Sequence, residues 1–306
     1  MFKRKGILSL LFLFVMIFIY LLLKESPMAL RQEIDHAPKV VQTSSQHMLD
    51  LDIYSSNAIL VNLDENQILL DKKSEEKIYP ASLTKMMTVL VAIEQISNLQ
   101  EEIILPKHIF QDLIEENASV AGFLPNEKLT LEDLLYGSML PSGAEASLGL
   151  AEYVAGGSER GFVKLMNEKA QQLGMKNTHF VNTTGLHHSD HYTTVKDMSL
   201  LLQYALTNDE FRNVYTAERY SIKSTNLHPE GITFTSRMFQ HMPSSILPGG
   251  EILGGKTGYT EDAGLCLASL ALINGQEYVL VTVGADGNPR TEQYNITDAM
   301  SVYSQL

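Results

Sequence analysis

The chain has 306 residues, which suits one large domain or two small ones with a sizeable core. It carries 23 Lys and Arg against 36 Asp and Glu, for a net charge of −13. The first 24 residues hold four bases and no acids, so the remainder has 19 bases against 36 acids. A body this acidic argues against binding to nucleic acid or to anionic lipid by charge.

An apolar run from Gly6 to Leu23 follows the basic cluster Lys3-Arg4-Lys5. Its 18 residues are just enough to span a bilayer, and the small residues that a signal peptidase needs do not follow it directly. We therefore expect residues 1–24 to form an uncleaved signal anchor, a single-pass membrane helix whose basic end stays in the cytoplasm. The rest of the chain would then be extracytoplasmic. A cleaved signal peptide, with a weak candidate site near Ala29, would instead give a secreted protein.

The segment after the apolar run is expected to connect it to the body of the protein. Residues 25–48 are polar with little periodicity, which is typical of a tether, and residues 49–306 form the predicted domain. Cys266 is the only cysteine, so the chain forms no internal disulfide. An exported protein without a disulfide points to a bacterial surface.

The domain begins with a predicted β-hairpin and a buried helix. In residues 57–73, two apolar runs flank Asp64-Glu65-Asn66, which is typical of a hairpin turn. A helix is expected to begin near Ala81, because it follows Pro80 and apolar residues then recur at helical spacing.

Helices and then strands make up the rest of the domain. Residues 107–215 are mostly helical in pattern, with Thr130 and Thr194 as predicted helix caps. Residues 264–285 predict two strands joined by Asn274-Gly275, and the C-terminal stretch predicts a last helix. This order predicts an α+β fold. An antiparallel β-sheet formed by both chain ends would be flanked by helices, with a mostly helical subdomain inserted.

Ser82 and Lys85 form an S-x-x-K triplet near the start of the buried helix. Residues three apart share one helix face, so the two side chains point the same way. A serine hydroxyl is a weak nucleophile until a base takes its proton, and a buried lysine of lowered pKa can be that base. The first turn of a helix also offers free N–H groups to a developing oxyanion. On a helix surface the triplet arises by chance, but here it opens an otherwise apolar helix.

The triplet Lys256-Thr257-Gly258 leads into a segment with strand character. Lys256 offers a charge and Thr257 a hydroxyl, which suit a carboxylate, and Gly258 lets a ligand backbone approach closely. Alternation along a strand would place Thr257 on the face opposite Lys256 and Gly258. The spacing from Gly250 also matches a phosphate-binding loop. That motif needs a preceding apolar strand and a following helix, neither of which is predicted here.

An S-x-x-K triplet followed far downstream by K-T-G is much rarer than either alone, and with an intervening S-x-N it is typical of penicillin-binding proteins and β-lactamases. Over residues 50–305 the sequence resembles the low-molecular-weight penicillin-binding proteins that act as D-alanyl-D-alanine carboxypeptidases. The likeness extends to the stretches YPASLTKMMT, LGMKNTHFVNTTGL, HYTTVKDMSLL and GGKTGYTEDAGLCLAS, in the same order. The resemblance implies a β-lactamase/transpeptidase-like fold.

The resemblance also implies roles for the residues of the first motif. Ser82 matches the serine that is acylated, and Lys85 matches its base. The family's oxyanion hole corresponds here to the backbone N–H groups of Ser82 and Tyr259. Ser142 would relay a proton between Lys85 and the leaving amine.

The downstream residues would bind the carboxylate end of the substrate. By the resemblance, Lys256 and Thr257 take that role. An arginine shortly after the last strand often assists in the family, and Arg290 is the match. The implied substrate is the D-Ala-D-Ala terminus of a peptidoglycan stem peptide, β-lactams would be inhibitors, and no cofactor or metal is expected.

The second motif departs from the family pattern. The family usually has Ser-Gly-Asn, whereas this chain has Ser142-Gly143-Ala144. Ala144 cannot offer the amide that normally bonds a substrate carbonyl and the first-motif lysine. Losing one such hydrogen bond costs about 1.5–3 kcal/mol, or one to two decades in rate. Glu145 or a water molecule is a candidate to replace the missing amide. The alternative interpretation is that residues 140–147 only connect two helices.

The stretch GLHHSDHY offers His187, His188, Asp190 and His191 as possible zinc ligands, and zinc peptidases that cut the same bond exist. The spacing lacks the helical i, i+4 pattern with a glutamate, and the resemblance aligns His191 with a structural loop position. We therefore expect no metal site here.

The sequence predicts a membrane-anchored serine-type D-Ala-D-Ala carboxypeptidase. One alternative is a β-lactamase-like hydrolase on the same fold, although an E-x-x-L-N stretch that would supply its deacylating glutamate is missing from the sequence. The other is a non-catalytic module that binds or senses the cell wall, which the change at Ala144 motivates.

Overall fold

The computed structural model describes residue 49, residues 51–111, residue 113 and residues 115–306. These residues belong to the compact unit Lys39–Leu306. The predicted anchor and tether lie outside them, so their boundaries stay predictions. Within the described part of the chain, none of the helices has the length and apolar character to cross a membrane.

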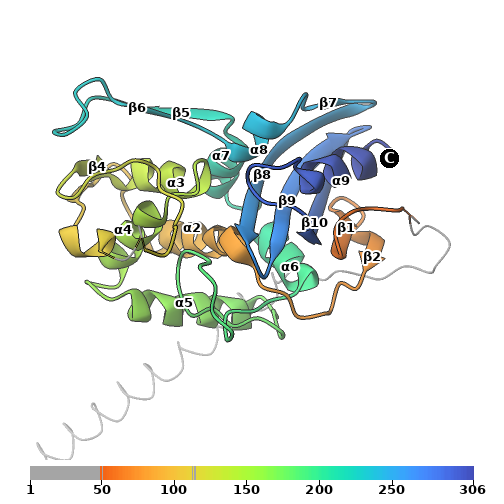
Figure 1. The fold of residues 1–306 in the computed structure, drawn as a ribbon, viewed down its shortest axis with the longest axis horizontal. Coiled ribbons are helices and arrows are strands. Elements are labelled where there is room, and N and C mark those ends of the chain that lie inside the picture. The colour runs from red at the N-terminus through yellow and green to blue at the C-terminus, as the bar shows by residue number, and fades with distance from the viewer. Residues whose placement is uncertain (1–48, 50, 112, 114) are drawn as a thin grey trace, which may run out of the picture. The chain divides into compact units, whose positions relative to one another are not determined.

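A six-stranded antiparallel sheet forms the centre of the structure, with the strand order β2-β1-β10-β9-β8-β7 (Figure 1). Strand β1 pairs with β10, so segments more than 200 residues apart in the chain lie side by side. The strands are β1 (Asn57–Asn62), β2 (Gln67–Lys72), β7 (Ile246–Leu247), β8 (Gly250–Thr260), β9 (Gly264–Ile273) and β10 (Gln276–Ala285). The prediction of a sheet built from both chain ends is confirmed.

Two local turns fix the register of the sheet, and both were predicted. Asn66 ends the β1–β2 turn with a φ of 52°, a left-handed conformation that Asn tolerates. Asn274 and Gly275 join β9 to β10 with φ values of 51° and 80°. Two successive positive φ values make the turn that matches the twist of a hairpin.

Helices cover both faces of the sheet. Helix α9 packs on β9 and β10 at one face. At the other face, α6 and α7, which belong to the inserted helical part, pack on the strands of the sheet. The helices are α2 (Thr84–Gln95), α3 (Leu131–Met139), α4 (Ala144–Val154), α5 (Glu159–Gln172), α6 (Val195–Ala205), α7 (Asp209–Thr216), α8 (Arg237–His241) and α9 (Tyr294–Tyr303). The described domain is therefore the predicted α+β arrangement.

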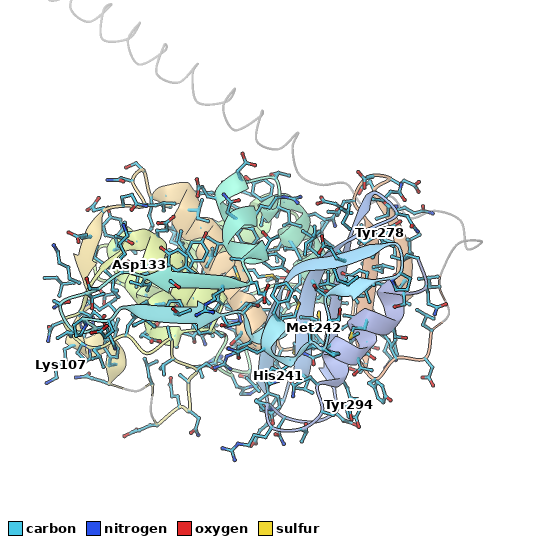
Figure 2. The ribbon with its side chains drawn as sticks, turned by 90° about the horizontal axis from the view of Figure 1, so that it is seen from above. Lys107, Asp133, His241, Met242, Tyr278 and Tyr294 are labelled. Atoms are coloured by element: carbon cyan, nitrogen blue, oxygen red, sulfur yellow. The ribbon has the colours of Figure 1, made fainter. Side chains whose placement is uncertain are left out.

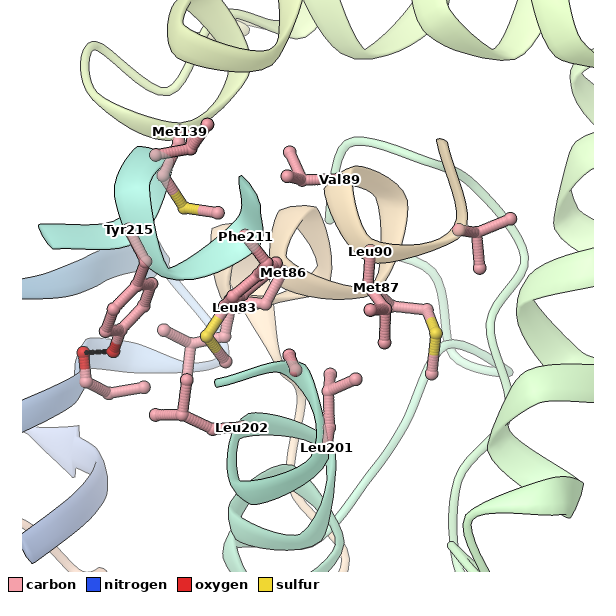
Figure 3. Close-up of a cluster of buried hydrophobic side chains, with 14 of the residues drawn as sticks. Leu83, Met86, Met87, Val89, Leu90, Met139, Leu201, Leu202, Phe211 and Tyr215 are labelled. Atoms are coloured by element: carbon pink, nitrogen blue, oxygen red, sulfur yellow. Dashed lines mark hydrogen bonds between the residues drawn. The ribbon is translucent and has the colours of Figure 1, made fainter. Parts of the chain in front are cut away.

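Helix α2 is the axis of the helical part, and its ten residues from Thr84 to Ile93 are all buried. Figure 3 shows Met86, Met87 and Leu90 among apolar side chains from α6 and α7. Burying one such side chain contributes about 1.5–3 kcal/mol. The short 3-10 helix η2 (Ala81–Leu83), which carries Ser82, thus leads directly into a helix that is buried over most of its length.

The remaining strands form two small hairpins at the edge of the helical part. Strand β3 (Glu102–Ile104) pairs with β4 (Lys128–Thr130), and β5 (Arg219–Ile222) pairs with β6 (Ile232–Thr235). Figure 1 shows β5 and β6 as an arm that runs along α3.

The predicted cap at Thr130 is a complete capping box. At Thr194 only the threonine side caps the helix, because the Asp197 carboxylate accepts bonds from residues 177 and 178 instead.

Candidate active site

The first predicted pair is in place at the junction of η2 and α2. Lys85 Nζ lies 3.2 Å from Ser82 Oγ, as the i, i+3 spacing predicts. Ser82 is half-buried, whereas the side chain of Lys85 is only 2% exposed. The hydroxyl can therefore meet a substrate while the amine stays out of water.

Burial lowers the pKa of Lys85 from 10.5 to about 7, with a further lowering by the positive charge of Arg237 and an opposing effect of Glu145. At neutral pH a large fraction of this amine is uncharged and can accept a proton. Lys85 Nζ donates to the carbonyl oxygen of Thr184 at 2.6 Å, which helps to hold the amine beside Ser82.

The loop Asn182–Leu186 holds this pair in position, and sequence reasoning gave it no role. Asn182 Oδ1 accepts from the backbone N–H groups of Thr184 and Gly185, and its amide donates to Leu186 O. Gly185 has a φ of +82°, and a Cβ there would lie 1.8 Å from the carbonyl oxygen of Ala81. The quoted stretch NTTGL was the available signal, because a glycine after such a polar turn marks close backbone contact.

Replacing Gly185 by alanine is expected to displace the nucleophile turn. The variant should lose covalent labelling by penicillin and unfold at a lower temperature than Gly174→Ala. Gly174 is a matched control, since it also has a positive φ, +74°, but has open space around its Cβ position. The control should lose only the backbone cost of about 1–2 kcal/mol. Equal labelling of the two variants would contradict this account.

Ser142 contacts Lys256 and has a strained backbone. Its φ is +67°, a left-handed conformation that costs a non-glycine residue about 1–3 kcal/mol. Its Oγ accepts a hydrogen bond from Lys256 Nζ at 2.9 Å. Lys256 is therefore an unpredicted hydrogen-bond partner of Ser142, and the relay expected between Lys85 and the leaving amine stays a prediction. The sequence could not show this hydrogen bond, because Lys256 is 114 residues further along the chain.

Strand β8 supplies the opposite wall. Lys256 is 1% exposed and also donates to Thr257 O at 2.8 Å. A Cβ on Gly258 would lie 3.1 Å from the backbone nitrogen of Ser82. Glycine thus lets β8 approach η2, and both Ser82 and Tyr259 line the same cavity. The oxyanion hole expected from their N–H groups stays a prediction.

These elements enclose a cavity of about 140 Å³. Thr257, Gly258 and Tyr259 all line it. The lining residues are Ser82, Asn117, Ser119, Ser142, Arg237, His241, Thr257, Gly258, Tyr259, Leu265, Pro289, Gln293 and Asn295. Figure 2 shows His241 near the start of α9, which Tyr294 marks. A larger hollow between α8 and α9 holds neither lysine nor Ser82.

Arg237 is the arginine that lines the cavity, and the sequence analysis missed it. It opens α8, where its backbone N–H donates to Leu140 O, and burial lowers its pKa. Arg290 lies on an exposed loop, and its neighbour Pro289 reaches the cavity instead. The role expected of Arg290 stays a prediction, and Arg237 is the better placed cation for a substrate carboxylate.

Glu145 has a different function from the one considered for it. Its Oε1 accepts three backbone hydrogen bonds, from Ala121 at 2.7 Å, Gly122 at 2.9 Å and Phe123 at 3.2 Å. The carboxylate is therefore bound to a loop, and it is absent from the residues that line the cavity.

The four residues of the histidine stretch are separately engaged. His191 accepts from Val181 N at Nδ1 and lies 2.9 Å from Thr84 Oγ1 at Nε2, while burial lowers its pKa to about 3. His187 pairs with Asp262, and His188 accepts from the backbone of Asp190. Among the described residues, no group of three or more His, Cys, Asp or Glu is arranged to hold a metal ion.

Comparison with known proteins agrees with the geometry. A family model described as D-alanyl-D-alanine carboxypeptidase matches residues 40–287. The carboxypeptidase DacF of Bacillus subtilis is 32% identical over 252 residues, which are 79% of this chain and 60% of that protein. DacD of Escherichia coli is 27% identical, with 79% and 61% covered. The chain thus spans about three-fifths of the length of these relatives.

The solved structures agree with the fold. The crystal structure of the Streptomyces K15 DD-transpeptidase superposes with a TM-score of 0.74 at 25% identity, covering 84% of this chain and 99% of that one. A Mycobacterium tuberculosis D-alanyl-D-alanine carboxypeptidase has the same fold, with a TM-score of 0.70 at 23% identity, covering 86% of this chain and 96% of that one. With its motifs assembled around one cavity and four-fifths of its length matched by the family model, the chain belongs to the D-alanyl-D-alanine carboxypeptidase family.

Proposed function

We propose that this protein removes the terminal D-Ala from peptidoglycan stem peptides through an acyl-enzyme on Ser82. The observation that carries the proposal is the buried Lys85 amine 3.2 Å from the hydroxyl of Ser82, which lines a cavity together with Thr257 and Arg237. A non-catalytic wall-binding module would have no use for a base desolvated beside a nucleophile.

Acylation begins when Lys85 accepts the proton of Ser82 and Oγ attacks the carbonyl carbon of the penultimate D-Ala. The N–H groups of Ser82 and Tyr259 stabilise the oxyanion. Thr257 and Arg237 hold the terminal carboxylate, which fixes the peptide in the attacking geometry.

The leaving amine takes a proton from the Ser142 hydroxyl, which Lys256 replenishes across 2.9 Å. The charge of Lys85 lowers the pKa of Lys256, so protonating Lys85 makes Lys256 a stronger acid. The two lysines would thus carry one proton between them through the cycle. Water then attacks the ester, Lys256 takes a proton back through Ser142, and Lys85 returns its proton to Ser82.

β-Lactams would acylate Ser82 in the same way and leave slowly. Among the described residues that line the cavity there is no Asp or Glu to activate water against a bulky acyl group. This argues for a penicillin-binding protein over a β-lactamase. Fast turnover of penicillin by the purified protein would contradict it.

We also propose that the apolar run Gly6–Leu23 anchors the protein in the cell membrane with the domain on the outer side. The basic residues before the run and its length support this orientation. Protease added to intact cells should digest the domain, whereas a domain protected until the cells are lysed would refute the orientation.

The direct test of the activity is D-Ala release from a stem pentapeptide by the full-length protein in detergent. We expect one D-Ala per peptide and no further trimming of the tetrapeptide. Failure to release D-Ala, with the protein folded, would rule out the proposed reaction. Transfer of the acyl group to an added amine instead of water would identify a transpeptidase.

A further inference from the structure

The loop Asn117–Phe123 packs directly against the second motif. The N–H of Ala144 donates to Ser119 O at 2.7 Å. A Cβ on Gly143 would lie 2.7 Å from the Cβ of Ala121, so the loop and the motif share one surface. The loop therefore occupies the space beside position 144, where the family places an amide side chain.

A buried carboxylate clamps this loop. Glu145 is fully buried, and its Oε1 accepts the N–H groups of three consecutive loop residues, Ala121 to Phe123. Its Oε2 is buried with no hydrogen-bond partner in the structure. Burying a carboxylate costs free energy unless hydrogen bonds replace its lost hydration. The three N–H groups of the loop supply such bonds to Oε1. The clamp thus fixes the loop against the motif.

Asn117 lies two residues before Ser119 and lines the same cavity as Ser82 and Ser142. Its φ of 49° is a left-handed conformation that asparagine adopts more readily than most residues. The other side-chain amides of the cavity, Gln293 and Asn295, come from the α9 side, and Asn295 already donates to Cys266 O. Asn117 is therefore the side-chain amide that the loop bonded to Ala144 contributes to this cavity.

We propose that Asn117 binds the substrate carbonyl in place of the missing side chain at position 144, and that Glu145 is the positioning residue for its loop. The inference rests on the proposed function, because the ligand is the N-acylated D-Ala-D-Ala peptide whose carbonyl carbon Ser82 attacks. An amide donor from the loop restores the contact that Ala144 cannot make. The second motif of this chain is then split between two segments.

The test removes the amide without straining the backbone. Asn117→Gly should lower kcat/KM for a stem pentapeptide about 10- to 100-fold, since glycine accepts the positive φ. Asn126→Gly is the matched control: it is exposed, lies at the far end of the same loop region, and has a φ of 65°. The control should keep wild-type kinetics.

Adding Ala144→Asn to Asn117→Gly should restore at least half of the lost activity on a logarithmic scale. Ala144→Asn alone should change kcat/KM less than threefold. The proposal is wrong if Asn117→Gly has the same kcat/KM as the control and Ala144→Asn alone raises kcat/KM tenfold. That result would mean that no amide replaces the one absent at position 144. Loss without rescue would assign the effect to loop geometry and would also overturn it.

A binding experiment separates this inference from the proposed function. An N-acylated D-Ala-D-Ala dipeptide is titrated into full-length Ser82→Ala, with and without Asn117→Gly, and the Kd is measured by NMR. The proposal expects a Kd at least tenfold higher with Asn117→Gly, even if the wild-type protein does not hydrolyse the peptide. An unchanged Kd would refute it, whatever the activity of the wild type.

Glu145 is tested by two substitutions. Glu145→Gln keeps a carbonyl oxygen for the loop N–H groups, whereas Glu145→Ala removes the clamp. If Glu145 is a positioning residue, Glu145→Ala should raise KM more than it lowers kcat. Glu145→Gln should have a KM close to that of the wild type. Identical KM values for the wild type and the alanine variant would contradict the role.

Discussion

Replacing Ser82 by alanine should abolish D-Ala release and covalent labelling by penicillin, with kcat falling about 10⁴-fold or more. The hydroxyl oxygen lies 3.2 Å from the buried Lys85 amine, and Ser82 lines the cavity. Without it no acyl-enzyme forms, and hydrolysis would need direct attack by water. The measurement is D-Ala release together with a fluorescent penicillin on a gel.

The same variant should fold normally, because Ser82 is half-buried and its hydroxyl has one contact, to Lys85. Its thermal unfolding curve should therefore match that of the wild type within a few degrees. Labelling that persists in Ser82→Ala would place the nucleophile elsewhere and remove the basis of the mechanism.

Removing the base should have an effect of similar size. Lys85→Arg substitutes a group that stays protonated at any working pH, and Lys85→Gln substitutes a neutral group that cannot accept a proton. Both should slow acylation by penicillin about 10³-fold or more. Lys164→Arg, on an exposed face of α5, is the control and should label like the wild type. Rapid labelling of either Lys85 variant would show that another group is the base.

The pH dependence of acylation follows from the same residue. Burial places the pKa of Lys85 at about 7, below its ordinary value, and only the uncharged amine can accept the proton of Ser82. The rate should therefore be low at pH 5.5, rise through pH 7 and level off above pH 8. Acylation rates over this range would test it, and a rate that falls with pH would contradict the assignment.

The chemistry of the site was predictable where it depends on local spacing. Ser82 and Lys85 are three residues apart on a helical turn, and Lys256 to Tyr259 are consecutive on one strand. The hairpin turns at Asn66 and Asn274 were predictable for the same reason, since the turn residues themselves set the backbone.

The parts that sequence reasoning missed are contacts across long separations. Lys85 meets Thr184, 99 residues away, and Lys256 meets Ser142. No period or motif encodes such pairings, because they arise when the sheet and the helical insertion pack together. Arg237 was missed for a similar reason: only the fold brings the start of α8 to the cavity.

The change at Ala144 looked like a loss when judged from the motif alone. In the structure the same segment begins α4, and its next residue, Glu145, binds the loop that carries Asn117 toward the cavity. A departure from a family pattern therefore has to be judged with the segment that packs against it.

The central claim is that Ser82 forms a covalent acyl-enzyme with the help of Lys85. It is tested most directly by a mass spectrum of the full-length protein mixed with penicillin, before and after a chase without the drug, with the modified peptide sequenced. The account predicts one penicilloyl group, attached to Ser82, that persists through the chase. No adduct, or an adduct on any other residue, would contradict it.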